Sequence, residues 1–417
     1  MEFMDVIEQI KSDQSNLVSG FEQGFAPVND FKRSPKYVQN LTEALRLVEG
    51  IQSGKVRPYV FQEAMTRSDF PLYFGDILDR SVLANYKAAG VNWRMISQVG
   101  QARDFRNKRI LSFDGPDQFL SEQVGEKQEY PMSRMGEATQ MYNLFKLGRV
   151  FDISWESMIN DDLNIFQRIP ADFARAAVRT EERFHTGLYT TVAGPSPALY
   201  TAPGANVVNG NLGTGVLNVN NLGIAIASMG MLVDPENNEP ILNEPRFLVI
   251  PPALKLTAER ILNSVNLVWQ VAARNAAGAA DSVRPFPTGN FLKDKLQIIV
   301  NPYLPLIDQA TGMSAWYLFA SPTDVAATEV GFLRGYESPQ IFIRKSDQQR
   351  VGGGDVSPLD GDFMTDNIMY KIRHILGGTQ IRPATATRGN VATYASTGTT
   401  ATITNYPNNA PAVEPVA

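Results

Sequence analysis

A long polar segment in the first half of the chain restricts the folds that are open to it. Residues 112–150 hold few apolar side chains and contain breakers such as Gly115-Pro116, but they keep strand-forming residues such as Tyr130 and Phe145. A structureless loop of this length is uncommon in a compact domain, where ~12–15 residues is already long. The segment is also too polar to form a core strand. We therefore predict an extended β-hairpin that finds its partners outside its own domain.

A long helix is predicted after this segment. Asn160-Asp161-Asp162 supplies side chains that cap the free amides of a helix N-terminus, and Pro170 suits a first-turn position. Apolar residues then recur at helical spacing as far as about Val192. The predicted core face of this helix consists of Phe173, Ala177, Phe184 and Leu188.

The second half of the chain alternates short apolar strands with helices, so the predicted class is α+β. Helices are expected over 222–233 and 254–262. Strands are expected over 247–250, 296–300, 316–319, 341–344 and 368–375. Beyond Arg382 the chain is dominated by small and polar residues and carries almost no charge, so it cannot bury enough apolar surface to become ordered. We expect a flexible tail there.

The composition suggests a surface that other protein covers. Charged residues make up 19% of the chain, against ~25% in an ordinary soluble protein. The net charge of -5 argues against a dedicated nucleic-acid binder, whose phosphate contacts need a clustered basic surface. The short basic cluster between Arg103 and Arg109 is therefore interpreted as a solvated or interface patch. No segment approaches the ~18 consecutive apolar residues that a membrane span needs.

Residue types suited to catalysis are scarce. Cysteine is absent, which excludes thiolate metal sites and cysteine nucleophiles, and His185 and His374 are the only histidines. No Gly-x-Ser-x-Gly elbow precedes either histidine, and no glycine-rich run has the context of a phosphate-binding loop.

Two acidic groups have ordinary structural explanations. The aspartates between Asp355 and Asp366 could ligate calcium or magnesium, but their spacing fits no EF-hand, and a solvated loop explains them. Asp161-Asp162 could act with Glu181-Glu182 as an acid–base pair, but helix capping and surface ion pairs account for all four. We therefore predict no catalytic, cofactor-binding or metal site.

Four groups of residues, taken in order, carry a resemblance to a known family. They are Phe61-Gln-Glu-Ala-Met65 with Phe70, Asp76 and Arg80; Glu126 to Tyr130 with Leu144-Phe-Lys-Leu-Gly148 and Ile153-Ser154; Ile159-Asn-Asp-Asp162 to Ala177 with Glu181; and Phe332-Leu-Arg-Gly335 with Pro339 and Tyr370-Lys-Ile-Arg-His374 to Gly377. In this order and spacing the chain resembles the major capsid (major head) proteins of tailed double-stranded DNA bacteriophages, which have the HK97-type fold. The resemblance covers about residues 60–383.

The resemblance implies a division of the chain into the parts of that fold. These are a helical N-terminal arm (1–60), a discontinuous peripheral domain with the long spine helix (61–113, 151–214 and 331–383), an extended β-hairpin loop (114–150), an axial domain (215–330) and the flexible C-terminal tail (384–417). The alanine-rich stretch 272–280 would lie at the tip of the axial domain.

The resemblance also implies where subunits meet. The extended loop would lie over a neighbouring subunit and contact it through Tyr130, Tyr142, Phe145 and Lys146. The loop 346–364 would meet its copies at a local threefold axis through Gly352, Gly353, Gly354 and Asp355. Some family members join subunits by a covalent lysine–asparagine bond, but non-covalent closure is expected here.

The implied function is self-assembly through pentamers and hexamers into an icosahedral shell that encloses packaged phage double-stranded DNA without sequence-specific binding. The chain would be assembled in the host bacterial cytoplasm and end in the virion, with scaffold, portal and decoration proteins as partners, no cofactor and no membrane. An encapsulin-like cargo compartment of the same fold is the alternative. An enzyme is disfavoured by the shortage of histidine and cysteine, and a decoration protein would remain a small oligomer in isolation.

Overall fold

The computed structural model describes residues 81–114, 136–154, 165–202, 210–231, 243–274, 280–323, 326–349, 361–381 and 393–398, with a few isolated positions besides. The chain divides into two compact units. Unit 1 comprises Met1–Gly90, Phe145–Thr180 and Arg334–Leu376, and unit 2 comprises Val91–Leu144, Glu181–Leu333 and Gly377–Ala417. Helix α6 (Ile165–Tyr189) and strand β15 (Asn367–Gln380) each contribute residues to both units.

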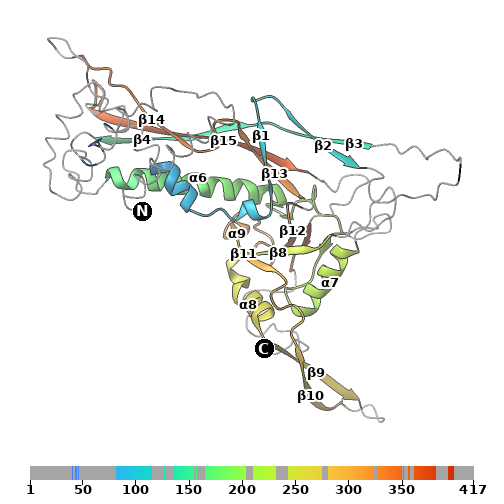
Figure 1. Cartoon of the computed structure of the whole chain (residues 1–417). Helices are drawn as coiled ribbons and strands as arrows, with labels where there is room; N and C mark the ends of the chain where they lie inside the picture. Colours follow the sequence, from blue (N-terminus) through green and yellow to red (C-terminus); the bar gives the residue numbers. More distant parts are fainter. Residues whose placement is uncertain are drawn as a thin grey trace. The chain divides into compact units, whose positions relative to one another are not determined.

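Unit 1 contains a three-stranded antiparallel sheet that packs one face on helix α6 (Figure 1). Strand β15 is central, with β14 (Gln340–Ile343) on one side and β4 (Phe145–Ser154) on the other. Side chains alternate along a strand, and Phe151 of β4 meets Phe173 of α6 edge-on, with ring centroids 6.4 Å apart. Ile341 of β14 packs against a buried cluster of Val82, Tyr86, Ala174 and Ala177.

Unit 2 is built on a five-stranded mixed sheet. Its strands, in spatial order, are β11 (Gln297–Val300), β8 (Pro245–Ile250), β12 (Trp316–Ala320), β16 (Thr393–Ser396) and β7 (Leu212–Gly213). Strand β8 pairs parallel with β11 and antiparallel with β12, and β16 pairs antiparallel with β12 and parallel with β7.

Alternate residues of the central strands enter two separate cores. Leu248 and Leu318 belong to a cluster that includes residues of α7 (Val219–Gly230) and α8 (Lys255–Asn263). Val249 and Tyr317, which point the other way, join a second cluster. A sheet that is covered on both faces needs apolar residues at every position, and this need explains the uninterrupted apolar runs in β8 and β12.

Unit 2 contains several further short elements. They are η2 (Trp93–Met95), β1 (Gln98–Ala102), β5 (Thr190–Thr191), β6 (Gly194–Pro195), η3 (Pro252–Leu254), α9 (Leu304–Ile307) and β13 (Thr328–Leu333). Strand β1 pairs parallel with β13. The end of β15 lies beside β13, since a Cβ added at Gly378 would meet the backbone of Glu329 and Val330.

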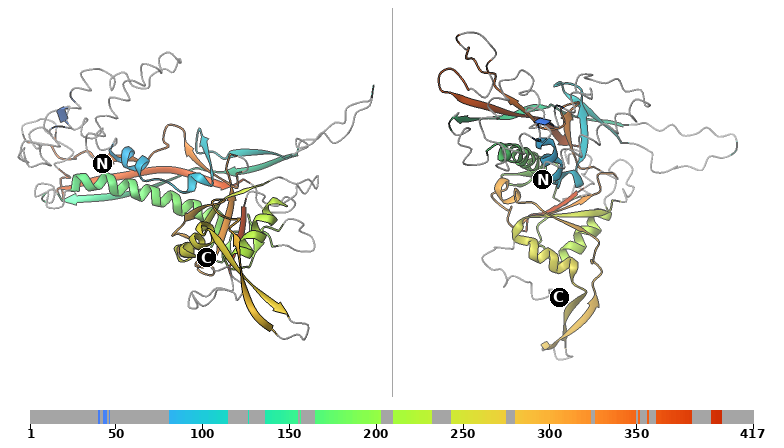
Figure 2. Two further views of the ribbon diagram at one scale, coloured as in Figure 1. Left: turned by 60° about the horizontal axis from the view of Figure 1, so that its bottom comes forward. Right: turned by 60° about the vertical axis from the view of Figure 1, so that its left-hand side comes forward.

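Two antiparallel ribbons extend from unit 2 (Figure 2). One pairs β2 (Lys108–Asp114) with β3 (Gly136–Tyr142), and the other pairs β9 (Asn266–Arg274) with β10 (Ala280–Gly289). Among the described residues, the strands of each ribbon pair only with each other. The alanine-rich stretch 272–280 falls at the end of the second ribbon.

The α+β class predicted from the sequence is confirmed. The five strands expected in the second half of the chain are present as β8, β11, β12, β14 and β15, and the two expected helices are α7 and α8. Nearly all of the predicted N-terminal arm lies outside the described residues.

The predicted flexible tail needs a correction. Residues 393–396 form β16, which lies between β12 and β7, and Thr393, Ala395 and Ser396 are buried. The Thr393 hydroxyl donates to the carbonyl of Leu318 at 2.7 Å. The prediction used the average composition of the whole tail. It therefore overlooked these four residues, whose threonine and tyrosine favour a strand.

The domain boundaries also differ from those implied by the resemblance. Residues 91–113 and 181–214, which were expected in the peripheral domain, lie in unit 2. The predicted long helix, expected to run to about Val192, ends at Tyr189, and Pro170 lies inside it rather than in its first turn.

Candidate subunit-contact surfaces

The β2–β3 ribbon is the first candidate surface. Its register runs from Lys108 opposite Tyr142 to Asp114 opposite Gly136, and residues 115–135 join the two strands. The extended hairpin predicted over 114–150 therefore starts earlier and ends earlier than expected. A two-stranded ribbon is marginally stable on its own in water, so this one needs either a firm attachment or an external partner.

A buried polar cluster attaches the root of the ribbon to β13. The Glu329 carboxylate accepts hydrogen bonds from the Lys108 ammonium at 2.6 Å and from the Tyr142 hydroxyl at 2.7 Å. The Glu329 side chain is 4% exposed and that of Lys108 is 25% exposed. Burial and the adjacent Glu329 carboxylate raise the pKa of Tyr142 well above its usual value, so its hydroxyl keeps the proton that it donates.

Two paired glycines make room for this cluster. Gly100 of β1 lies opposite Gly331 of β13. A Cβ at Gly100 would collide with the Glu329 carboxylate, and a Cβ at Gly331 would collide with the Tyr142 ring. Side chains at these two positions would therefore expel the groups that hold the ribbon.

A second set of buried polar contacts connects the segment before β1 with helix α6. The Trp93 indole N–H donates to Glu181 at 3.0 Å, and the backbone N–H of Asn92 donates to Glu182 at 2.6 Å. Burial raises the pKa of Glu182, although the backbone N–H groups of Asn92 and Trp93 oppose this shift.

His185 belongs to the same buried region. It lies 3.1 Å from the Thr328 hydroxyl and is tilted against the rings of Trp93 and Tyr189. Burial lowers the pKa of His185 to about 3, so the ring is neutral at physiological pH. It has the contacts of a packed core residue, and no partner for acid–base chemistry lies among them.

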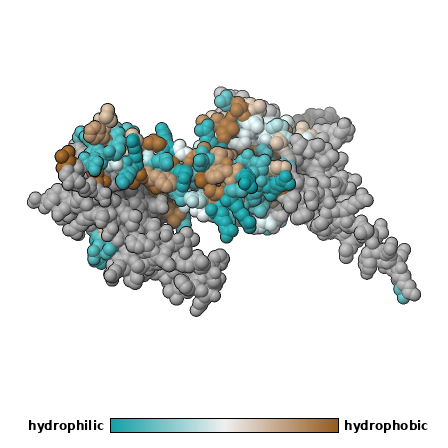
Figure 3. All heavy atoms as spheres, turned by 90° about the horizontal axis from the view of Figure 1, so that it is seen from above, coloured by the Kyte–Doolittle hydropathy of each residue, from teal (hydrophilic) through white to brown (hydrophobic). Residues whose placement is uncertain are grey.

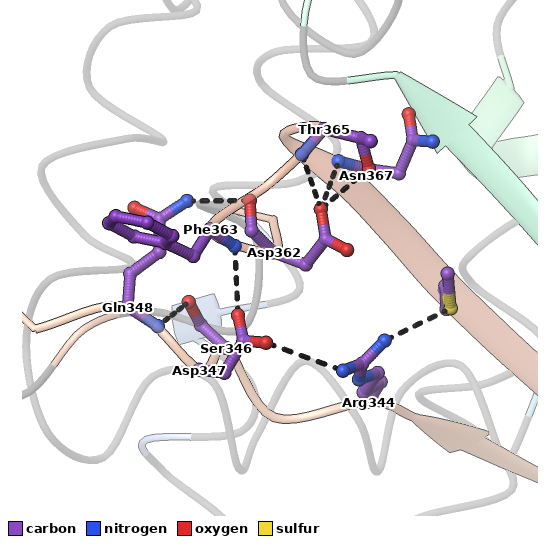
Figure 4. Close-up of polar contacts among 9 residues, drawn as sticks. Arg344, Ser346, Asp347, Gln348, Asp362, Phe363, Thr365 and Asn367 are labelled. Atoms are coloured by element: carbon purple, nitrogen blue, oxygen red, sulfur yellow. Dashed lines mark hydrogen bonds and ion pairs between the residues drawn. The ribbon is translucent and has the colours of Figure 1, made fainter.

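The second candidate surface is the loop between β14 and β15, whose two stems are joined by polar contacts (Figure 4). Asp347 pairs with Arg344 at 3.4 Å and accepts the backbone N–H of Phe363 at 2.8 Å. Asp362 accepts the hydroxyl and the backbone N–H of Thr365, and these bonds lower the pKa of its carboxyl. The contacts leave Phe363 and Met364 largely exposed to solvent.

The structure does not place all of the predicted contact residues of the extended loop in the β2–β3 ribbon. Tyr142 is buried against Glu329 of its own chain, so its predicted contact with a neighbour is not supported. Phe145 and Lys146 lie on β4, where they pair with β15 rather than forming part of the hairpin, and both are exposed. Tyr130 lies outside the described residues.

The predicted threefold residues Gly352, Gly353, Gly354 and Asp355 also lie outside the described residues. The structure describes only their flanks, including the stems around Asp347 and Asp362. Asp362 makes its contacts with backbone and hydroxyl donors there.

The buried face of α6 is offset from the prediction. Ala177 is buried as expected, but Phe173, Phe184 and Leu188 are only partly buried. The fully buried positions follow a neighbouring stripe formed by Ala174, Ala177, Glu181, His185 and Tyr189. Glu181 and His185 lie on this stripe because Trp93 and Thr328 supply their hydrogen-bond partners.

The polar cluster of Lys108, Tyr142 and Glu329 at the root of the ribbon was not predicted from the sequence. Lys108 was assigned to a basic patch, and Glu329 was not singled out at all. The available signal was a glutamate inside the apolar strand sequence of β13, because a buried carboxylate requires a partner.

Within the described part of the chain, no group of three or more metal-ligating side chains is found. No helix among those described is long and apolar enough to cross a membrane.

Comparison with known proteins assigns the chain to a family. A model of the phage capsid protein family matches residues 137–389. Among curated protein sequences none matches. Solved structures that are similar include a protein of Microbacterium phage Oxtober96 (10% identity, 74% of this chain and 90% of that chain covered, TM-score 0.40) and the capsid of the cyanophage P-SCSP1u (11%, 74% and 88%, 0.40). Another is the SrpI encapsulin of Synechococcus elongatus PCC 7942 (10%, 72% and 84%, 0.38).

TM-scores this low carry no weight in the assignment, so it depends on the family match, which spans more than half of the chain. Members of this family are structural shell proteins of the virion, not enzymes, and they act as oligomers. The resemblance inferred from the sequence is thereby confirmed: this chain belongs to the phage capsid protein family.

Proposed function

We propose that this chain is the major capsid protein of a tailed double-stranded DNA phage, with an HK97-type fold, and that it closes an icosahedral shell from pentamers and hexamers. In this proposal unit 1 supplies most of the peripheral domain, and the five-stranded sheet of unit 2 supplies the axial domain. Assembly takes place in the host cytoplasm with a scaffold and a portal, and decoration proteins bind afterwards. The shell encloses DNA without reading its sequence, in keeping with the net charge of -5.

The observation that supports a shell most directly is the β2–β3 ribbon. Its root is held by the ion pair between Lys108 and the buried Glu329 and by the hydrogen bond from the buried Tyr142 to Glu329, yet its strands pair only with each other in the described part of the chain. An attachment this firm suits a projection that must contact something beyond its own unit. The tip with Tyr130, strand β4 with Phe145 and Lys146, and the loop 352–355 are the proposed contacts with neighbouring copies.

Electron microscopy of the purified chain, with and without residues 115–135, tests this proposal. The deletion should replace 115–135 with a short glycine–serine linker, so that β2, β3 and the Lys108–Glu329 pair are retained. We expect closed shells or capsomers from the intact chain, and soluble capsomers that fail to close from the variant. Intact particles from the variant would contradict the role of the ribbon, and DNA-free particles filled with protein cargo would favour an encapsulin-like compartment.

A further inference from the structure

Helix α6 carries a row of arginines along its exposed side. Arg175, Arg179 and Arg183 follow one another at intervals of four residues. Each therefore lies about 6 Å further along the helix axis than the one before it, and about 40° further around the axis. All three side chains are exposed, whereas the buried stripe of α6 lies on the other side of the helix. We call these three residues the arginine row.

The arginine row keeps a net positive charge. Arg175 pairs with Asp172 at 2.5 Å, but both side chains are more than half exposed, and such pairs are weak. In the part of the chain that the structure describes, no acid lies within ion-pair distance of Arg179 or Arg183. The nearby Glu182 carboxylate instead accepts backbone N–H groups of the segment before β1. Two of the three guanidinium groups are therefore available to an external anion.

The exposed side of α6 lacks the apolar side chains that are typical of a protein contact. None of the large exposed hydrophobic side chains of the described residues belongs to 171–189, and the small residues Ala176 and Gly187 occupy further exposed positions there. The sheet of unit 1 differs, since it exposes Val150 and Phe342. Figure 3 looks down on the side where these strands lie in Figure 1 and shows hydrophobic and hydrophilic groups interspersed. Contacts with nucleic acid are more polar and more positively charged than contacts between proteins, so the composition of the α6 side favours nucleic acid.

A second group of basic residues, between 103 and 109, is less suited to a polyanion. Lys108 is already bound to the buried carboxylate at the ribbon root, and Arg106 lies 3.8 Å from Asp104. The Phe105 ring, 45% exposed, lies in the middle of this group. A mixture of paired charge and exposed aromatic surface fits a protein contact better than a phosphate backbone. This group therefore provides a matched control for the arginine row.

We propose that the arginine row of α6 faces the interior of the shell and binds phosphates of the enclosed DNA. This inference rests on the proposed shell function and specifies which surface of the chain meets the DNA. Guanidinium groups present forked donors that match phosphate oxygens, and contacts to phosphate alone carry no sequence information. Arg179 and Arg183 bind directly, and Arg175 exchanges Asp172 for a phosphate. Because every copy in the shell repeats the row, weak single contacts add up along the DNA.

The salt dependence of duplex binding tests this contact. A short fluorescent DNA duplex is titrated at several salt concentrations with the unassembled chain and with two double variants, and fluorescence anisotropy gives each binding constant. Each phosphate contact contributes about 0.9 to the slope of log K against log salt, so Arg179→Gln/Arg183→Gln should make the slope shallower by about 1.8. The control Arg103→Gln/Arg106→Gln removes the same charge and should keep the wild-type slope. An unchanged slope in the first variant, or an equal change in both, would overturn the proposal.

Assembly provides a readout that separates this contact from the shell function. Arg179→Gln/Arg183→Gln should still close empty shells, and closed wild-type shells should bind much less added duplex than the unassembled chain, because the row then faces inward. A variant that no longer closes shells, or closed shells that bind the duplex as well as the unassembled chain does, would overturn the DNA contact. So would a polyglutamate peptide that binds the row more tightly than a duplex of equal charge, since it would assign the row to an acidic protein segment. A wild-type chain that forms no oligomer at all would instead overturn the shell function itself.

Discussion

The five-stranded sheet of unit 2 and the strands β14, β15 and β4 of unit 1 distribute their apolar residues differently. In the five-stranded sheet of unit 2, Leu318 and Tyr317 point to opposite sides and both are fully buried. In the sheet of unit 1, one face packs on α6, where Phe151 is still 41% exposed, and the other face leaves Val150 59% and Phe342 37% exposed. The first sheet is therefore completed within the chain, whereas the second keeps a face that, in the proposed shell, another copy completes.

The largest expected effect is the difference in unfolding free energy between a substitution in the sheet of unit 2 and one in the sheet of unit 1. Leu318→Ala should lower the free energy of unfolding by about 3 kcal/mol, because it leaves a cavity in a sheet that is covered on both sides. Val150→Ala, on the open face, should change it by no more than ~0.5 kcal/mol. Urea unfolding of the two variants measures both values. Equal losses would break the distinction between a completed sheet and an open one.

The ribbon root offers the next test. Glu329→Gln should lower the free energy of unfolding by ~1–3 kcal/mol, because it leaves the largely buried Lys108 ammonium without its counter-charge. The control is Glu259→Gln, which removes the exposed partner of Lys255 and should cost at most ~1 kcal/mol. A Glu329→Gln loss no larger than the control would mean that the ion pair does not hold the ribbon.

Measuring stability at several pH values tests whether His185, on the buried face of α6, stays neutral in the folded chain. The pKa of His185 is lowered from 6.5 to about 3, so the unfolded chain takes up a proton below pH 6.5 that the folded chain refuses. Stability should therefore fall as the pH drops from 6.5 toward 3, by roughly 2 kcal/mol between pH 7 and pH 5 from this residue alone. His185→Gln should remove that part of the pH dependence in urea titrations. An unchanged slope would mean that His185 is accessible to protons in the folded chain.

The smallest effect on folding should come with a large effect on assembly. Val150→Asp and Val150→Lys should each change the free energy of unfolding by less than ~0.5 kcal/mol, since the side chain is exposed. If a neighbouring copy covers this face in the shell, either charge should suppress particle formation, because it would be buried in an apolar contact. Light scattering during assembly measures particle formation, and normal assembly of both variants would argue against a buried contact at Val150.

The features that the sequence predicted correctly are those determined by neighbouring residues. The apolar runs at 247–250 and 316–319 predicted β8 and β12 because a doubly covered strand is apolar throughout. The polar, breaker-rich segment likewise predicted a hairpin.

The missed features depend on contacts between residues far apart in the chain. Glu181 can be buried because it accepts a hydrogen bond from Trp93, which is 88 positions away in the sequence. Lys108 points inward because it pairs with Glu329, which is 221 positions away. Strand β16 escaped notice because four residues in a low-complexity tail gain their order only from pairing with β12. The glutamate inside the apolar sequence of β13 indicates that a buried partner exists. No local pattern identifies that partner, so the contacts of the ribbon root and of the buried face of α6 could not be predicted.

A cryo-electron microscopy reconstruction of assembled particles tests most directly whether another copy completes the open sheet of unit 1. We predict density of a neighbouring copy across the face of this sheet that carries Val150 and Phe342. A reconstruction in which this face remains open to solvent would contradict that prediction.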